Sequence, residues 1–262
     1  MGVALLAAGC SPAKPPSHPS RPVPVSQATT PPVTERAAHD RFTVALSAEA
    51  VREARTGGVN LPRLVAHALG RINALLPGPR TTIAVNYLSA ARLIPQTGTA
   101  GVTDPVTGQV LVGFGPTPQI SLDEALKFWL PRTLSHEVDH SVRILAGPRF
   151  GVTLLQQTIS EGISSVFDEA AFPGPPNPWD RAISPAQECI LWKKAQPLLL
   201  DTRLYDQWMF GGSGVPHWTA FTIVYDIVKD YRHRHPRTSW GALTSATAPT
   251  ILSGSHYQPC SH

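Results

Sequence analysis

The residues that could do chemistry together lie in the segment 133–141, which contains His136, Glu137 and His140 in the spacing H-E-x-x-H. On a helix, residues four positions apart lie on the same face, so the two imidazoles could bind one Zn²⁺ through two nitrogens. The carboxylate of Glu137 would lie beside that metal, where it could take a proton from a water molecule. Two surface histidines and an acidic residue on a solvated helix would give the same letters by chance, so other parts of the chain have to support the site.

A third ligand is expected, because a catalytic zinc keeps three protein ligands and one open position. Glu161 is the next acidic residue after His140 and lies in a stretch with helical periodicity. A helix that returns antiparallel after Gly147-Pro148 would place Glu161 over the metal. The alternative is an acidic residue favoured near a helix N-terminus by the helix dipole. Asp168 lies about two helical turns after Glu161, and from that face it could accept the free N–H of a ligand histidine.

Hydrolysis of a peptide bond at zinc also needs a donor for the negative charge that develops on the carbonyl oxygen. Tyr225 is the first candidate, because it lies in a helical stretch with apolar neighbours. A tyrosine that packs on the core with a solvated hydroxyl is the alternative interpretation. His217 is a second candidate because it begins that stretch after Pro216, although a histidine at a helix start is more often structural or exposed.

The helix that carries the motif is predicted to begin at Leu122, because Ser121 and Glu124 have the spacing of a capping box. Pro131 should kink or restart this helix, which is expected to end at Gly147-Pro148. The stretch has its own apolar stripe, which should hold the motif against a core: Leu134, Val138, Val142 and Leu145.

Upstream of the motif, helical and extended patterns alternate from His39 onward. Helical spacing occurs in 47–55 and in 64–76, and 81–87 has the β-branched and aromatic residues of a buried strand. A turn at 104–108 predicts a hairpin whose second strand is 109–114. We expect an α+β fold in which a small mixed or antiparallel sheet packs on the helix with the motif. The C-terminal half should be mostly helical.

At the amino terminus, small apolar residues run into Cys10 and resemble the lipobox of a bacterial lipoprotein, in which this cysteine is lipidated. Ala7 stands where leucine is usual and no Lys or Arg precedes the run, so a true start upstream or a chance cysteine are the alternatives. Residues 1–10 are therefore predicted to be a partial lipoprotein signal and 11–38, rich in Pro, Ser and Thr, a linker. The folded domain is expected at 39–262, outside the cytoplasm in the bacterial cell envelope and tied to the membrane surface if Cys10 is lipidated.

The composition suits a soluble globular domain, with 42% hydrophobic and 15% charged residues in a chain of 262. The net charge is +4 and no run of Lys and Arg forms a stripe, so the sequence gives little support for nucleic-acid binding. If Cys10 is lipidated, Cys189 and Cys260 remain as a pair that could form one disulfide in an oxidising envelope, and two unrelated thiols are the alternative. The oligomeric state is open.

An H-E-x-x-H motif followed by a glutamate on a second helix resembles the gluzincin metallopeptidases. The chain is also similar to a bacterial family of predicted zinc-dependent proteases, in the stretches 134–143, 160–164, 208–228 and 251–257. The family usually has Gly-Tyr twice in the third stretch, whereas this chain has Ala220-Phe221 and Val224-Tyr225. That departure removes one tyrosine and leaves the role of Phe221 open.

The resemblance implies a zincin-like fold, a Zn²⁺ cofactor and a peptide or protein substrate, with water activated by Glu137 at the His136, His140 and Glu161 site. A strand such as 110–113 could bind the substrate backbone by β-augmentation. The alternatives are an envelope-tethered binding lipoprotein with a structural or vestigial zinc site, and an amidase that acts on cell-wall peptides.

Overall fold

The computed structural model describes residues 33–35, 41–148 and 150–260, which belong to one compact unit. Cys10 and the predicted lipobox lie outside the described residues. A short strand, β1 (Val33–Glu35), lies within the predicted linker and pairs antiparallel with β2 (Phe42–Leu46). The sheet therefore begins earlier than the composition predicts, because strand pairing uses backbone groups that every residue but proline supplies in full. No helix in the described part is long and apolar enough to span a bilayer.

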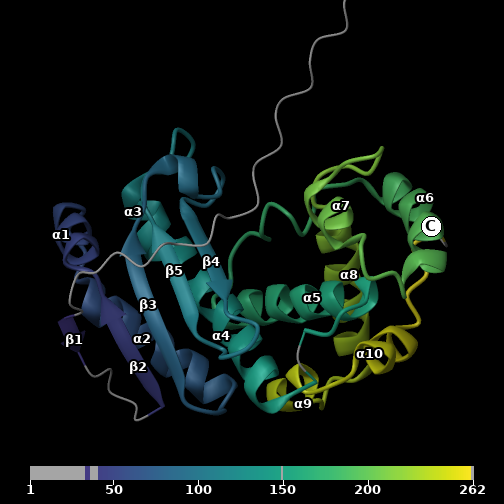
Figure 1. The fold of residues 1–262 in the computed structure, drawn as a ribbon, viewed down its shortest axis with the longest axis horizontal. Helices are drawn as coiled ribbons and strands as arrows, with labels where there is room; N and C mark the ends of the chain where they lie inside the picture. Colours follow the sequence, from purple (N-terminus) through teal and green to yellow (C-terminus); the bar gives the residue numbers. More distant parts are fainter. Residues whose placement is uncertain (1–32, 36–40, 149, 261–262) are drawn as a thin grey trace, which may run out of the picture. The chain divides into compact units, whose positions relative to one another are not determined.

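The sheet has the strand order β1-β2-β3-β5-β4, which is shown in Figure 1. Strands β2, β3 (Thr81–Tyr87) and β5 (Val110–Phe114) are parallel, whereas β4 (Thr99–Thr103) runs antiparallel to β5 as the predicted hairpin. This order corrects the expectation that 110–113 receives a substrate backbone. Strand β5 is hydrogen-bonded on both sides, and the edge strand next to it is β4.

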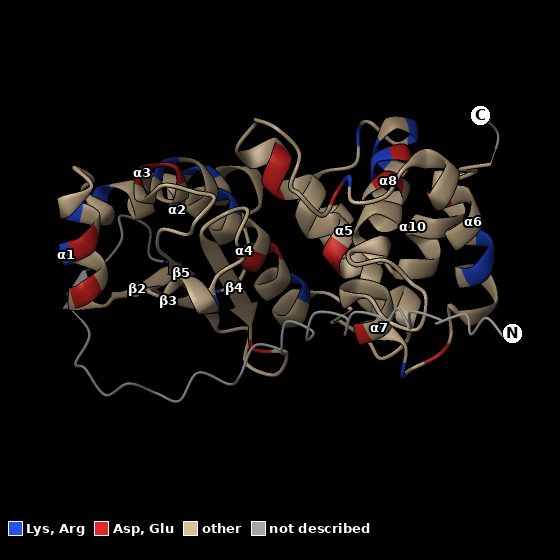
Figure 2. Cartoon of the chain, turned by 90° about the horizontal axis from the view of Figure 1, so that it is seen from above, with Lys and Arg blue, Asp and Glu red and all other residues tan. Residues whose placement is uncertain are grey.

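Three helices cover the sheet, and their buried side chains form an apolar core with those of the strands. They are α1 (Ala48–Thr56), α2 (Leu61–Leu75) and the motif helix α4 (Leu130–Ala146). Side chains of β3 alternate between buried and more exposed, and Ile83 and Val85 are fully buried. Figure 2 shows charged residues of both signs along the helices, as on α1, which carries several Glu and Arg side chains.

The motif helix is reached through a distorted helical segment. Helix α3 (Leu122–Glu124) begins as predicted after Ser121, whose hydroxyl accepts from the Glu124 N–H at 3.2 Å. A π-helical turn at Ala125–Trp129 follows, and α4 then starts with Pro131 in its first turn. Proline has no N–H to donate and its ring clashes with the carbonyl four residues earlier, so the wide turn before it is a physical consequence of Pro131.

The C-terminal half is helical, as predicted, and its central helix is α5 (Leu154–Ala171), which packs against α4 and against α8 (Thr219–Arg234). Cys189 and Cys260, the predicted pair, form a disulfide that ties the chain after the last helix to α6. The remaining elements are η1 (Ala90–Arg92), α6 (Pro185–Ala195), η3 (Gln196–Leu198), α7 (Tyr205–Phe210), α9 (Trp240–Thr244) and α10 (Ala248–Ser255). The α+β fold class, with a mixed sheet and a helical second half, is confirmed.

Candidate metal centre

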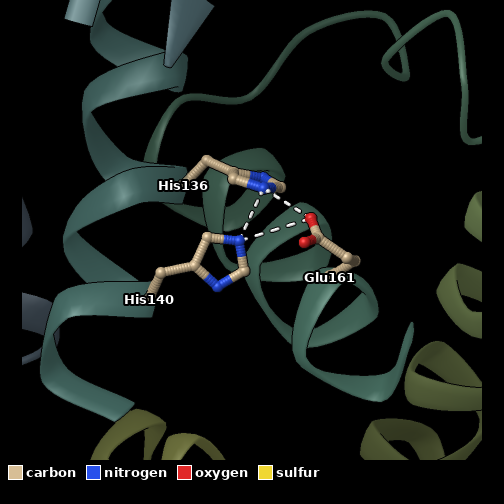
Figure 3. Close-up of side chains that lie close together, drawn as sticks. All are labelled: His136, His140 and Glu161. Carbon is tan, nitrogen blue, oxygen red and sulfur yellow. Dashed lines mark hydrogen bonds and ion pairs between the residues drawn. The ribbon is translucent and has the colours of Figure 1, made fainter. Parts of the chain in front are cut away.

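Helices α4 and α5 bring together the three predicted metal ligands (Figure 3). The Nε2 atoms of His136 and His140 lie 3.1 Å apart, and Oε2 of Glu161 lies 3.2 Å from the first and 3.3 Å from the second. All three side chains are buried, with relative exposures of 8%, 3% and 8%. The geometry thus gathers two ring nitrogens and one carboxylate oxygen around a single point.

Close packing of three helices sets this geometry. Helix α5 begins with a capping box between Thr153 and Gln156, which fixes where it turns back along α4. Gly162, next to the ligand Glu161, faces α8, and a Cβ at this position would lie 2.6 Å from the carbonyl oxygen of Val224. A glycine is therefore required for α5 to fit between α4 and α8 at the level of the site.

The orientation of His136 is fixed by Asp168, the residue predicted for this role. Oδ2 of Asp168 lies 3.4 Å from Nδ1 of His136, and the carboxylate is buried. Arg132, itself 1% exposed, donates to Oδ1 of Asp168 from Nε at 2.9 Å and from Nη2 at 2.6 Å. A carboxylate paired with arginine accepts a hydrogen bond, so Nδ1 of His136 carries a proton, and in the neutral ring Nε2 then keeps its lone pair.

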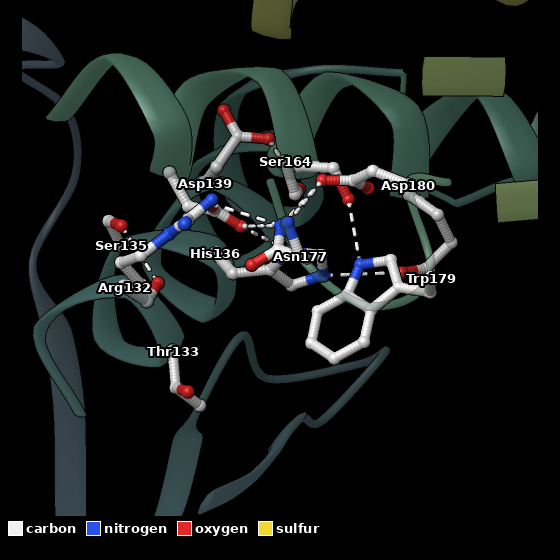
Figure 4. Close-up of polar contacts among 12 residues, drawn as sticks. Arg132, Thr133, Ser135, His136, Asp139, Ser164, Asn177, Trp179 and Asp180 are labelled. Atoms are coloured by element: carbon white, nitrogen blue, oxygen red, sulfur yellow. Dashed lines mark hydrogen bonds and ion pairs between the residues drawn. The ribbon is translucent and has the colours of Figure 1, made fainter. Parts of the chain in front are cut away.

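The loop after α5 supplies a further donor to this carboxylate, Asn177, which Figure 4 shows beside His136. Asn177 donates from Nδ2 to Oδ2 of Asp168 at 3.1 Å and to Oδ2 of Asp180 at 2.9 Å. Burial and the nearby charge of Asp168 raise the pKa of Asp180 to about 7. The spacing of residues in the sequence gives no indication of Arg132 or Asn177. Arg132 becomes a candidate only from the structure, in which it is fully buried one turn before the motif.

The second histidine has different partners on its far side. Nδ1 of His140 lies 3.0 Å from Oγ of Ser164 and 3.3 Å from Oγ of Ser160, both on α5. The ring also packs on Phe150, with centroids 4.5 Å apart. The two Nε2 atoms of the histidines therefore point inward while their Nδ1 atoms are held by side chains from α5.

The electrostatics of the triad favour a cation. Burial lowers the pKa of His136, but the carboxylates of Asp168 and Glu161 outweigh burial and raise it well above its ordinary value. Burial raises the pKa of Glu161, but His140 and His136 outweigh it and the net shift is well below the ordinary value. Both shifts show that the carboxylates stabilise positive charge at this point, which a proton on His136 supplies in the metal-free protein and a bound metal ion could supply instead.

A zinc ion fits this donor set. Tetrahedral ligands at zinc distances of about 2.0–2.1 Å lie about 3.3 Å from one another, and the three separations here are 3.1 to 3.3 Å. Two imidazole nitrogens and one carboxylate oxygen are also the ligand types of a catalytic zinc site that keeps one position open.

The side chain of Glu137 extends from the motif helix α4 toward the edge strand β4. Its Oε2 accepts a hydrogen bond of 2.7 Å from Oγ1 of Thr103 on β4, and the residue is 7% exposed. A Cβ at Gly101 would lie 2.5 Å from Oε1 of Glu137, so the absence of a side chain on β4 makes room for this carboxylate. Glu137 directly follows the candidate ligand His136 in the chain, and its charge raises the pKa of both His136 and Tyr205.

Tyr205 is a residue of the site that sequence reasoning missed. Its hydroxyl, on α7, donates to Oε1 of Glu161 at 3.1 Å. Burial first, and then the charge of Glu161, raise the pKa of Tyr205 well above its ordinary value, so the hydroxyl keeps its proton at neutral pH. The only signal in the sequence is its place three residues before the family-like stretch that starts at Trp208.

Among the described residues, no hydrogen bond joins Tyr225 or His217 to the triad. The hydroxyl of Tyr225 donates to Oε2 of Glu169 at 2.6 Å, about two helical turns along α5 from the ligand glutamate. Helix α8 faces the site region with Val224, which packs on Gly162, so its neighbour Tyr225 points elsewhere. His217 is exposed and stacks on Trp218 with ring centroids 4.3 Å apart.

The fold and the site define an α+β protein with a buried His-His-Glu candidate metal centre beside the edge of a mixed sheet. A family model described as predicted Zn-dependent protease (DUF2268) matches residues 65–253, and the chain belongs to this family. The matched region contains all three candidate ligands, Glu137 and Tyr205. Among curated proteins and among solved structures, no match was found.

Proposed function

We propose that this protein is a zinc-dependent peptidase of the gluzincin type, in which His136, His140 and Glu161 hold the metal. The observation that carries the proposal is the convergence of these three donors beside a second buried carboxylate, Glu137. Bound zinc would supply a Lewis acid that polarises the scissile carbonyl and lowers the pKa of a water molecule. The chain's own residues would supply the proton transfers, the oxyanion donor and the binding of the peptide.

Glu137 is suited to move the proton. The hydrogen bond from Thr103 occupies Oε2 and holds the side chain in place, while Oε1 lies over Gly101. From this position the carboxylate would take a proton from the attacking water and later deliver it to the nitrogen of the leaving amine. A base held within a buried site beside the ligands needs little reorganisation during the reaction.

Tyr205 takes the role of oxyanion donor that the sequence suggested for Tyr225. Its hydroxyl stays protonated because its pKa is raised, and it already lies beside Glu161. A neutral hydroxyl at this point would donate a hydrogen bond to the negative oxygen of the tetrahedral intermediate. Tyr225, in contrast, is committed to Glu169 and Lys229.

An extended peptide is the substrate form that suits the edge of the sheet. Beyond a single bridge between Ile94 and Thr99, no strand of the described residues pairs with the outer edge of β4. A peptide added there as a further strand would run past Gly101 and Glu137. The substrate backbone would thereby be placed next to the proposed base.

The direct test is to incubate the zinc-loaded protein with a diverse peptide pool that includes cell-wall peptides, beside the variant Glu137→Gln. We expect cleavage by the wild type, and a loss of about 10²–10⁴-fold in rate in the variant with its zinc retained, because only the proton transfer is removed. A wild type that binds zinc and cleaves nothing, or a variant with full activity, would contradict the proposal.

A further inference from the structure

Asp139 lies inside the motif, but its carboxylate makes no hydrogen bond to any of the three candidate metal ligands among the described residues. Its carboxylate is fully buried and accepts from hydroxyls on two other helices. Oγ of Ser164 on α5 donates to Oδ2 at 2.7 Å, and Oγ1 of Thr244 on α9 donates to Oδ1 at 2.5 Å. Arg143, one turn further along α4 and equally buried, supplies a compensating positive charge nearby.

The hydroxyl of Ser164 joins this carboxylate to His140. A serine hydroxyl carries one proton, and here the proton is donated to Asp139. Toward Nδ1 of His140, 3.0 Å away, Ser164 can then offer only a lone pair, which favours the neutral tautomer with the proton on Nδ1. In this tautomer the lone pair is on Nε2, the atom that faces the candidate metal position and lies 3.1 Å from Nε2 of His136 and 3.3 Å from Oε2 of Glu161.

Ser160 provides an internal comparison. It lies on the same helix as Ser164 and its Oγ is 3.3 Å from the same ring nitrogen. Among the hydrogen bonds of the described residues, Ser160 Oγ has no second partner, so its proton is free to turn toward or away from His140. A hydroxyl without a committed proton cannot select one tautomer over the other.

We infer that Asp139 is a positioning residue that fixes the metal-binding tautomer of His140 through Ser164. The tautomers of the two histidines would then be set in different ways. Asp168 contacts His136 directly, whereas Asp139 acts on His140 through the hydroxyl of Ser164. The inference rests on the zinc site of the proposed function, but it concerns the proton on a ring nitrogen, and this can be measured without any substrate.

The first measurement is the tautomer of His140, read from the ¹⁵N chemical shifts of its ring nitrogens in the metal-free protein at a pH where the ring is neutral. We expect the Nδ1–H form in the wild type. In Asp139→Ala, Ser164 is free to donate to Nδ1, and we expect a shift toward the Nε2–H form. A wild-type ring in the Nε2–H form, or a tautomer that does not change in Asp139→Ala, would overturn the inference.

The second measurement is zinc affinity, determined by competition with a chelator. We expect Ser164→Ala to weaken zinc binding by about 10–100-fold, Ser164→Thr to restore most of the loss because it keeps a hydroxyl, and Ser160→Ala to change it by a few-fold at most. Thr244→Val removes a hydrogen bond from Asp139 without touching the relay, so it controls for general loosening of this region. Equal losses in Ser160→Ala and Ser164→Ala would overturn the inference.

The double variant Asp139→Ala/Ser164→Ala separates a relay from two independent contacts. If both residues act through one hydroxyl, the double variant loses no more zinc affinity than the worse single variant, whereas independent effects would add. Should Asp139→Ala fail to fold, the Ser164 and Ser160 variants still decide the matter. A protein that shows this pattern of zinc affinities and tautomers but cleaves no peptide contradicts the proposed function alone.

Discussion

The hydroxyl of Tyr205 lies 3.1 Å from Oε1 of Glu161, the carboxylate oxygen that does not face the two histidines. Glu161 thus divides its two oxygens between the candidate metal position and a protonated tyrosine from another helix. This contact connects α7 to the ligand set, and it gives the tyrosine a position next to the reacting atoms that Tyr225 does not have.

Tyr205→Phe should lower the rate of peptide hydrolysis and leave zinc bound. Loss of one oxyanion donor typically costs about 10²–10³-fold in kcat, while the ligands themselves are unchanged. The measurement is kcat together with zinc content. Tyr225→Phe is the matched control, since it removes a hydroxyl bonded to Glu169 outside the triad. It should retain kcat and lower the free energy of unfolding by about 1 kcal/mol. A larger loss of kcat in the control would contradict this assignment.

Gly101→Ala should impair activity more than stability. The new Cβ would lie 2.5 Å from Oε1 and 2.6 Å from Cγ of Glu137, so the side chain of Glu137 has to move. The carboxylate is the flexible end of a side chain, and the displacement should cost little free energy of unfolding while it misplaces the base. Gly241→Ala is the control, because a Cβ there meets nothing within 4 Å. Hydrolysis and thermal unfolding measured on both variants check the prediction, which fails if Gly101→Ala keeps wild-type kcat.

The metal-free protein should be most stable in mildly acidic solution. Glu161 has a lowered pKa, so its contribution is present above its ordinary value of 4.5 and is lost as the pH falls toward the folded-state pKa. His136 has a raised pKa, so its contribution is complete below its ordinary value of 6.5 and is lost as the pH rises through the folded-state pKa. Both contributions are therefore present together between about pH 4.5 and 6.5.

Bound zinc should counteract the loss of stability that the metal-free protein shows as the pH rises above about 6.5. Metal binding needs neutral imidazoles, so the stabilisation by zinc increases as the pH rises. We expect the zinc-induced increase in Tm to grow from pH 5 to pH 8, as measured by thermal unfolding with and without the metal. In metal-free His136→Ala, the part of the stability loss between pH 6.5 and pH 8 that comes from deprotonation of His136 should be absent. A zinc effect independent of pH would contradict the assignment of the imidazoles as ligands.

The parts of the site that follow helical periodicity could be predicted from the sequence. His136 and His140 are one turn apart, and Asp168 is about two turns after Glu161, so each pair shares a helix face before any tertiary structure is known. The pairing of Cys189 with Cys260 followed from the count of three cysteines once Cys10 was assigned to the lipobox.

The rest depends on tertiary packing that no local pattern encodes. Tyr205 reaches Glu161 across 44 positions of the sequence, and Thr103 reaches Glu137 across 34. The partner of Tyr225, Glu169, could not be predicted either, because Val224 packing on Gly162 sets the rotation of α8 about its own axis. A hairpin pattern does not tell which of its two strands joins the rest of the sheet, so the sequence could not exclude 110–113 as the strand that receives a substrate.

The disulfide should stabilise the fold without affecting the metal centre. Cys189 and Cys260 close a loop with a sequence separation of 71, and in the chain-entropy model such a cross-link contributes about 4 kcal/mol to the free energy of unfolding. The double variant Cys189→Ser/Cys260→Ser should therefore unfold at lower denaturant concentration. Its zinc affinity should equal that of the wild type, because the triad is held by α4, α5 and α7, none of which carries either cysteine. A loss of zinc affinity without global unfolding would show that α6 supports the site.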